Sequence, residues 1–348
     1  MIKLRAMGLG DVGQVIALLG AFRDEVPRYR LFLTLRHLFA PLQALSMALP
    51  PTWQFTPAIF TAASNGRVLA VLGLSKDPDW TTRWKIDQLL LAPDVSTYDV
   101  ASQLAHYALN RYGAEGVQTF IALTHPRYEQ ALALLKACGF RPLAQQWTYH
   151  HASPGQCERP AIFIAGLREA TCADAKGLKT LSDQTLPVEK RLYMERSARA
   201  FSRSFAHATL DTLRGRFFKR WVVADAARDL LLGSVSVASA DLQTYDISWM
   251  VSSGWPEGDA ELLEFALHHV SEQTRKATVR VTAYSFQKER LAMLQAKGFE
   301  RGEETQLLVR DFWTPLQDKP RRGASPILLF SRKTSTACGS PLSDATQQ

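Results

Sequence analysis

Two aspartates lie inside otherwise apolar segments with the pattern of β-strands, Asp87 in RWKIDQLLL and Asp246 in TYDISWMV. A carboxylate at such a position is costly unless water solvates it or a partner binds it. A carboxylate that a substrate can reach can also take a proton as a general base. Both aspartates are therefore candidate catalytic residues. The structural alternative for each is a carboxylate bound to neighbouring backbone or to an arginine.

The two aspartates belong to an internal repeat. Gly298-Phe299 follows Gly139-Phe140 by the same number of residues as the second aspartate follows the first. Near the start of each copy, LREATCAD repeats the Leu-Arg and Asp positions of LRAMGLGD. Two copies of one folding unit explain these matches.

The expected elements follow the same order in each copy. In the first copy, Asp11 is an expected helix N-cap, and Asn65-Gly66 supplies the positive φ of a tight hairpin turn. The full order is a strand, helical sequence to about Leu49, a hairpin, a strand, a helix, a strand, a helix and a strand. The second copy repeats it from FIAGLREA to TQLLVRDFW.

The repeat also predicts the domain boundaries. A chain of 348 residues suits two domains of about 150 residues each. We expect the first domain in residues 1–150 and the second in residues 163–315. Residues 151–162 are the expected linker, because HASPGQCERP is rich in residues typical of loops. The basic tail, residues 316–348, is expected to be mostly disordered.

The composition limits the compartment and the kinds of site. Hydrophobic residues make up 46% and charged residues 21%, as in folded proteins and unlike disordered chains. No apolar run reaches the roughly 18 residues of a membrane span, and the start lacks the apolar core of a signal peptide. The cysteines form no CxxC pair. We therefore expect a cytoplasmic protein with reduced thiols, no membrane contact and no metal site.

The formal net charge of +8 is unevenly distributed, with a basic stretch from Lys190 to Arg220. Such a stretch is compatible with a solvated helix face or with a wall that faces an anion. No RNA- or DNA-binding motif accompanies it, so nucleic acid is not an expected partner.

This order of elements, with a strand-loop-helix in the middle and a late helix that ends in Gly-Phe, resembles the GNAT superfamily of acetyl-CoA-dependent N-acetyltransferases. The resemblance covers both copies. It implies an α/β fold of two tandem GNAT-like domains, each with a mixed, mostly antiparallel sheet flanked by helices. It also implies that the chain is an acyl-CoA-dependent N-acyltransferase, with acetyl-CoA as co-substrate and an amine as acceptor.

In this superfamily the fourth strand binds the pantetheine arm, and a basic residue followed by Gly-x-Gly-x-Gly or Ala cradles the pyrophosphate at a helix N-terminus. The resemblance assigns cofactor binding to Met250, Val251, Gly258, Asp259 and Ala260 in the second copy and to Leu91 and Ala101 in the first. The first loop has Asp99 at a glycine position, where a carboxylate repels phosphate. Gly258 and Ala260 keep two small positions of the second loop. The C-terminal domain is therefore the expected catalytic unit, and the N-terminal domain is expected to be degenerate.

The same resemblance gives Asp246 and Asp87 the role of base, because the family commonly places a carboxylate on the fourth strand. The family's usual acid, a tyrosine four residues before the glycine of Gly-Phe, is replaced by Leu135 and Leu294. Tyr128 and Tyr284 lie near the same region of each copy without matching that motif.

The expected acceptor is an amine on a small molecule or a protein. Segments that join the first two helices of the family commonly wall the acceptor site, and in the second copy they include the basic stretch. The acceptor is therefore expected to be anionic overall. The alternative function is a non-catalytic scaffold or ligand-sensing module, because both loops depart from the family pattern and a fold does not guarantee activity.

Overall fold

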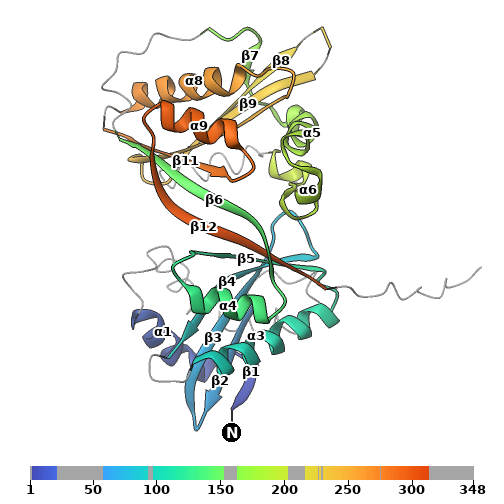
Figure 1. Cartoon of the computed structure of the whole chain (residues 1–348), viewed down its shortest axis with the longest axis vertical. Helices are drawn as coiled ribbons and strands as arrows, with labels where there is room; N and C mark the ends of the chain where they lie inside the picture. The colour runs from blue at the N-terminus through green and yellow to red at the C-terminus, as the bar shows by residue number, and fades with distance from the viewer. Residues whose placement is uncertain are drawn as a thin grey trace, which may run out of the picture. The chain divides into compact units, whose positions relative to one another are not determined.

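The strands of both halves join in one mixed sheet in the computed structural model (Figure 1). The structure describes residues 2–21, 58–92, 97–152, 163–202, 216–225, 227–228, 230–274 and 276–312. Within these residues the sheet has twelve strands, in the order β1-β2-β3-β4-β5-β12-β6-β11-β10-β9-β8-β7. The expected helical sequence to Leu49, the expected linker beyond Ala152 and the C-terminal tail lie outside the described residues.

The N-terminal half, residues 1–152, contains β1 (Lys3–Ala6), η1 (Leu9–Asp11), α1 (Val12–Ala21), β2 (Ala58–Ser64), β3 (Arg67–Lys76), β4 (Arg83–Leu91), α3 (Thr97–Ala114), β5 (Thr119–Thr124), α4 (Glu129–Ala137) and β6 (Arg141–Ala152). The C-terminal half, residues 163–312, contains β7 (Leu167–Glu169), η4 (Cys172–Asp174), α5 (Ala175–Thr185), α6 (Val188–Met194), η5 (Ala198–Ala200), β8 (Phe217–Asp225), β9 (Leu230–Ser239), β10 (Thr244–Val251), α8 (Gly258–Gln273), β11 (Thr278–Tyr284), α9 (Lys288–Ala296) and β12 (Glu300–Asp311). The predicted α/β fold is confirmed.

The repeated Arg and Asp near the start of each half form the same contact twice. Arg5 Nη2 donates to Asp11 Oδ1 at 2.7 Å, and Arg168 donates through both terminal nitrogens to Asp174 at 2.7 and 2.8 Å. The hydrogen bond from Arg168, against a smaller opposing effect of burial, holds the pKa of Asp174 far below its ordinary value. This ion pair fixes the turn from the first strand into the first helix of each half.

The repeated Gly-Phe pair ends a helix in both halves. Gly139 and Gly298 have φ of 83° and 79°, a conformation that favours glycine. The amide of Phe140 then donates to Leu135 O at 3.0 Å, and the amide of Phe299 donates to Leu294 O at 3.0 Å. Each phenylalanine is buried in the core of its half. The motif therefore ends a helix and fills the core in both halves.

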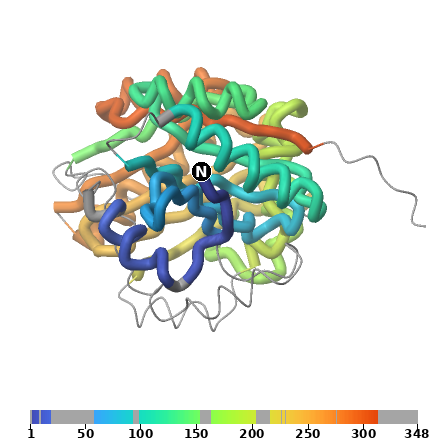
Figure 2. The backbone as a smooth tube through the Cα atoms, turned by 90° about the horizontal axis from the view of Figure 1, so that it is seen from below, coloured from blue at the N-terminus to red at the C-terminus, as the bar shows by residue number. Residues whose placement is uncertain are grey.

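Two layers of helices enclose the N-terminal sheet. Helices α3 and α4 cover one face, where Phe60 and Trp84 are fully buried. Helix α1 covers the other face, where Val15 packs with Val71 and Leu90. Figure 2 shows α1, in dark blue, on the opposite side of the strands from α3, in teal. In the C-terminal half, α8 and α9 pack on one face of the sheet, and α5 packs on the other.

The last strand of each half pairs with the other half. β12 lies between β5 and β6, so that Leu308 pairs with Ala122 and is buried in the N-terminal core. β6 also pairs with β11, so that Tyr149 pairs with Val281 and is buried in the C-terminal core. Each half therefore completes its sheet and its core with a strand from the other. Separating the halves would break three backbone ladders, β5–β12, β12–β6 and β6–β11, and expose both cores.

This exchange predicts that the chain holds together after a cut between the halves. A protease site introduced within residues 153–162 should give two fragments under denaturing conditions. Under native conditions these fragments should co-elute at the size of the intact chain, because β6 and β12 keep their ladders. Two separate native peaks in size-exclusion chromatography would contradict the exchange.

Candidate active site

The ladder between the fourth and fifth strands of each half ends early. β4 pairs with β5 in parallel only over Arg83–Ile86, although β4 continues to Leu91. β10 pairs with β11 only over Thr244–Ile247, although β10 continues to Val251. Beyond these points the strands splay apart in both halves. A splayed strand offers backbone groups to an extended ligand.

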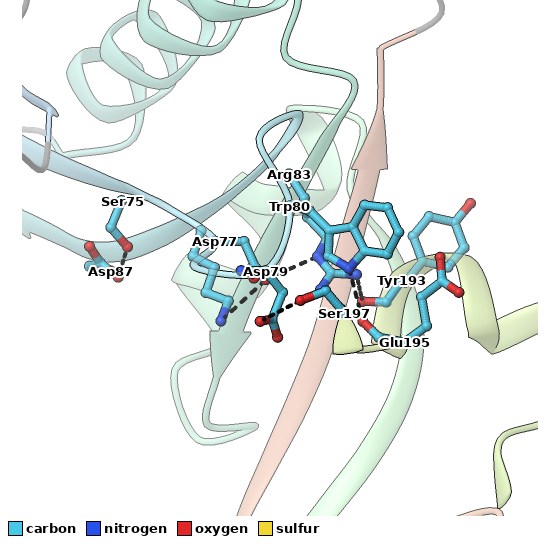
Figure 3. Close-up of polar contacts among 10 residues, drawn as sticks. Ser75, Asp77, Asp79, Trp80, Arg83, Asp87, Tyr193, Glu195 and Ser197 are labelled. Atoms are coloured by element: carbon cyan, nitrogen blue, oxygen red, sulfur yellow. Dashed lines mark hydrogen bonds and ion pairs between the residues drawn. The ribbon is translucent and has the colours of Figure 1, made fainter. Parts of the chain in front are cut away.

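In the N-terminal half, a β-bulge marks the point where the splay begins. Gly73 pairs with Gln88 and Leu74 pairs with Ile86, so Asp87 is the extra residue of β4. A bulge changes the direction of a side chain and is common beside active sites. Asp87 is exposed and accepts a hydrogen bond from Ser75 Oγ at 2.8 Å (Figure 3). The corresponding register between β9 and β10 is continuous.

Asp246, the matching aspartate of the C-terminal half, forms a two-pronged ion pair with Arg280 of β11. Arg280 Nη2 donates to Asp246 Oδ2 at 2.6 Å, and Arg280 Nε donates to Oδ1. This hydrogen bonding raises the pKa of Arg280. Both oxygens of the Asp246 carboxylate are therefore bound by the arginine. The contact is the structural alternative that the sequence left open for this position.

A buried cation, Arg290 of α9, occupies the splay of the C-terminal half. Its Nη1 donates to the carbonyl of Trp249 at 3.3 Å, and its Nη2 donates to Asp259 at 2.6 Å. Its guanidinium also lies over the Trp249 ring at 4.5 Å. The side chain of Arg290 is only 13% exposed, and burial lowers its pKa although Asp259 opposes that shift. A carbonyl of the splayed strand is thus bound by the chain itself.

The loop before α8 is also packed against its own residues. A Cβ at Gly258 would lie 2.5 Å from the Trp255 ring, so glycine is needed there for packing. The amide of Gly258 donates to Trp255 O, and the amide of Ala260 donates to Glu257 O. These two amides are used within the loop. Asp259, besides binding Arg290, accepts from Trp249 Nε1 at 2.5 Å.

The other residues assigned to cofactor binding have packing contacts. Met250 packs against the cluster beneath α5, and Val251 packs against the C-terminal core. Leu91 packs against the N-terminal core, in which Ala101 is fully buried. Residues 93–96 of the first loop lie outside the described residues. Helix α3 follows them, and the amides of its first turn have no partner within the helix.

The tyrosines near each splay differ in environment. Arg127 Nη2 donates to the hydroxyl of the exposed Tyr128 at 2.8 Å. Tyr284 stacks on Phe286 with ring centroids 5.3 Å apart, and burial raises its pKa. Among the described residues, no group of three or more His, Cys, Asp and Glu side chains is placed to hold a metal ion. No helix in the described part of the chain is long and apolar enough to span a bilayer.

Two arginines that sequence reasoning missed hold this region together. Arg290 fills the second splay, and Arg83 joins the two halves close to the first. Both precede or follow apolar residues in amphipathic segments and have no motif around them. The available signal for Arg83 was the acidic hairpin sequence KDPDWTTR, in which an arginine follows two aspartates.

Replacing Asp259 by Asn should destabilise the C-terminal half, because Arg290 then keeps a buried charge without its counter-ion. We expect the free energy of unfolding to fall by about 1–3 kcal/mol, measured by urea denaturation. The double variant D259L/R290M, which removes both charges, should recover most of that loss. Equal destabilisation by both variants would contradict a buried charge pair at this position.

Comparison with known proteins agrees with this geometry. Residues 30–140 match the model of the acetyltransferase (GNAT) family. No curated protein matches the chain. A tandem GNAT protein from the clavulanic acid biosynthesis pathway is 18% identical, with 90% of this chain and 99% of that one covered and a TM-score of 0.54. A GCN5-related N-acetyltransferase from Sphaerobacter thermophilus is 12% identical, with 90% and 96% covered and a TM-score of 0.55.

These identities are low, so the structural likeness concerns the fold. It extends over nearly the whole chain, and the family match lies in the N-terminal half, around the strand that carries Asp87. Together with the two splayed strand pairs, the comparisons show that the chain has the fold of a tandem GNAT protein and that residues 30–140 are similar to the acetyltransferase (GNAT) family.

Proposed function

We propose that the protein is an acyl-CoA-dependent N-acyltransferase that transfers an acetyl group to an amine, with the N-terminal half as the reacting unit. One observation carries this proposal. The ladder between β4 and β5 ends at Ile86, and the next residue is the bulged, exposed Asp87. A thioester lying along the rest of β4 would therefore have a carboxylate beside it.

The sequence favoured the C-terminal half because Gly258 and Ala260 keep small positions in its loop. The contacts of that half weigh against acetyl-CoA there. Arg290 binds the Trp249 carbonyl, and the amides of Gly258 and Ala260 donate within the loop. Asp246 is held by Arg280. We infer that the C-terminal half acts as a scaffold for the N-terminal one.

The proposed chemistry needs few groups. The pantetheine arm of acetyl-CoA would form hydrogen bonds with the backbone of Gln88–Leu91. The phosphates of acetyl-CoA would lie toward the N-terminus of α3. The amine attacks the thioester carbonyl while Asp87 takes a proton from its nitrogen. The tetrahedral intermediate then collapses, releasing the amide and the thiolate of coenzyme A. Leu135 occupies the family's acid position, so water would protonate that thiolate.

The acceptor is proposed to be a small-molecule or protein amine that is anionic overall. The basic stretch supports this only in part. Lys190 and Arg191 donate to the backbone carbonyls of Leu143 and Leu186, and residues 203–215 lie outside the described residues. If the acceptor is anionic, the rate of acetyl transfer should fall when the ionic strength is raised tenfold, because salt screens exposed charges.

Replacing Asp87 by Asn should lower kcat for acetyl transfer by about 100-fold or more, because the general base is lost. The affinity for acetyl-CoA, measured by isothermal titration, should stay within twofold of that of the unaltered chain. The matched variant D246N should reduce kcat less than threefold. A larger loss in D246N than in D87N would reverse the assignment of the two halves.

Binding itself gives a second check. Acetyl-CoA at 100 times its dissociation constant should stabilise the folded chain by about 2.7 kcal/mol, which is visible as a rise in the midpoint of thermal unfolding. Titration should give one equivalent per chain, since Arg290 occupies the second splay. No thermal shift with acetyl-CoA, propionyl-CoA or free coenzyme A would favour the non-catalytic alternative.

A further inference from the structure

A buried arginine binds the connection between β3 and β4, called the hairpin below, to the C-terminal half. Arg83, at the start of β4, is 6% exposed, and its Nε donates to Asp77 at 2.9 Å. Its Nη1 donates to Tyr193 O, and its Nη2 donates to Glu195 O, both at 3.0 Å. Figure 3 shows this fork between the hairpin and the end of α6. One guanidinium thus binds a carboxylate of one half and two carbonyls of the other.

The partner of Arg83 is the end of α6 together with the segment that follows it, residues 193–197, which we call the turn. The last carbonyls of a helix have no partner within it, and cations are favourable there. Trp80 Nε1 also donates to Glu195 O at 3.1 Å, and Ser197 Oγ donates to Asp79 at 3.3 Å. The hairpin therefore binds this segment at the carbonyls of Tyr193 and Glu195 and at the side chain of Ser197.

The ionised carboxylate of Asp77 is the counter-ion of Arg83 in this contact between the two halves. Burial alone would raise the pKa of Asp77. The Asp79 amide and the Arg83 guanidinium outweigh that effect and leave the pKa below its ordinary value. Lys85 Nζ also lies 3.4 Å from the carboxylate. The buried arginine is thus fully paired, which a buried charge requires.

A second set of contacts fixes α6 to the exchanged strands. Tyr193 Oη donates to Asp311 of β12 at 2.8 Å. Lys190 Nζ donates to Leu143 O of β6 at 2.7 Å. Tyr193 is also buried against Ile121 of β5 and Val309 of β12. Helix α6 of the C-terminal half is thus anchored on the sheet that serves the N-terminal half.

Helix α6 lies on the same face of the sheet as Asp87. On β3, Ser75 lies four residues after Val71, so both side chains lie on the face that α1 covers. On β4, Lys85 faces away from α3, since its neighbours Trp84 and Ile86 pack on that side. On this face α1 covers Val71, and α6 covers Ile121. Among the described helices, these two flank the strip that carries Ser75, Lys85 and Asp87.

We propose that the acceptor amine binds on this strip, with the C-terminal half's turn 193–197 as one wall of its site and Arg83 as the residue that positions that wall. The inference rests on the proposed function of the N-terminal half. An amine must come to the face on which the carboxylate of Asp87 lies, and Arg83 holds the turn at the start of the same strand. The acceptor site is therefore composite, and acceptor selection needs both halves.

Arg83→Lys is the diagnostic change, because lysine keeps the positive charge beside Asp77 but lacks the fork that reaches two carbonyls. With a panel of primary amines that includes a diamine, an amino acid and a lysine peptide, R83K should raise the acceptor KM at least tenfold. The KM for acetyl-CoA should stay within twofold, and kcat should fall less than threefold. The matched control is Arg168→Lys, in an arginine–aspartate pair that contacts neither the turn nor the strip. Its kinetics should equal those of the unaltered chain.

A photo-crosslinking arm decides the outcome even if no amine in the panel is accepted. The probe is the CoA thioester of an acyl chain that carries a diazirine, used with the full-length chain. Acyl labelling of residues 193–199 together with N-terminal peptides, and its loss in R83K, would support the inference. Labelling confined to residues 1–152, or an acceptor KM unchanged in R83K, would overturn it and leave the proposed function standing. A chain that binds no CoA thioester would remove the proposed function and this inference with it.

Discussion

The unpaired edge of a β-strand is the constraint on which this structure depends. In each half, the fifth strand must pair on its far side, because its buried amides and carbonyls need partners. β5 takes β12 as that partner, and β11 takes β6. The two halves therefore share their sheets and their cores. Because neither half's sheet is complete without the other, the second copy is required even if only one copy reacts.

The two copies differ at the end of the ladder between the fourth and fifth strands. In the first copy a bulge there directs Asp87 outward beside Ser75. In the second copy the strand runs on without a bulge, and Arg290 fills the opening with Asp259 and Trp249. The same backbone splay thus supports two outcomes. The side chains that meet there determine whether the opening can receive a ligand or is closed by the chain itself.

Two arginines inside the protein, Arg83 and Arg290, are paired in a similar way. Arg83 is buried and Arg290 is largely buried, and each guanidinium binds one carboxylate and at least one backbone carbonyl. Such pairs add little net stability compared with apolar packing, but they require one particular arrangement, since any other leaves a buried charge unpaired. At Arg83 this requirement fixes how the hairpin meets the end of α6. At Arg290 it fixes how α9 meets β10.

Local signals in the sequence determined the repeat and its elements. Asn65-Gly66 adopts the positive φ of its turn, Gly-Phe ends a helix twice, and the repeated arginine and aspartate pair within a few residues of each other. The sequence also located Asp87 and Asp246 and left their partners open. Contacts within a turn or a helix end depend on nearby residues, so they can be read along the chain. Tertiary structure alone decided the strand exchange, the pairing of Asp246 with Arg280, the closure by Arg290 and the joint at Arg83. Each of these depends on how elements far apart in sequence pair or pack, and hydrophobic periodicity specifies which face a residue takes but not which element lies beside it.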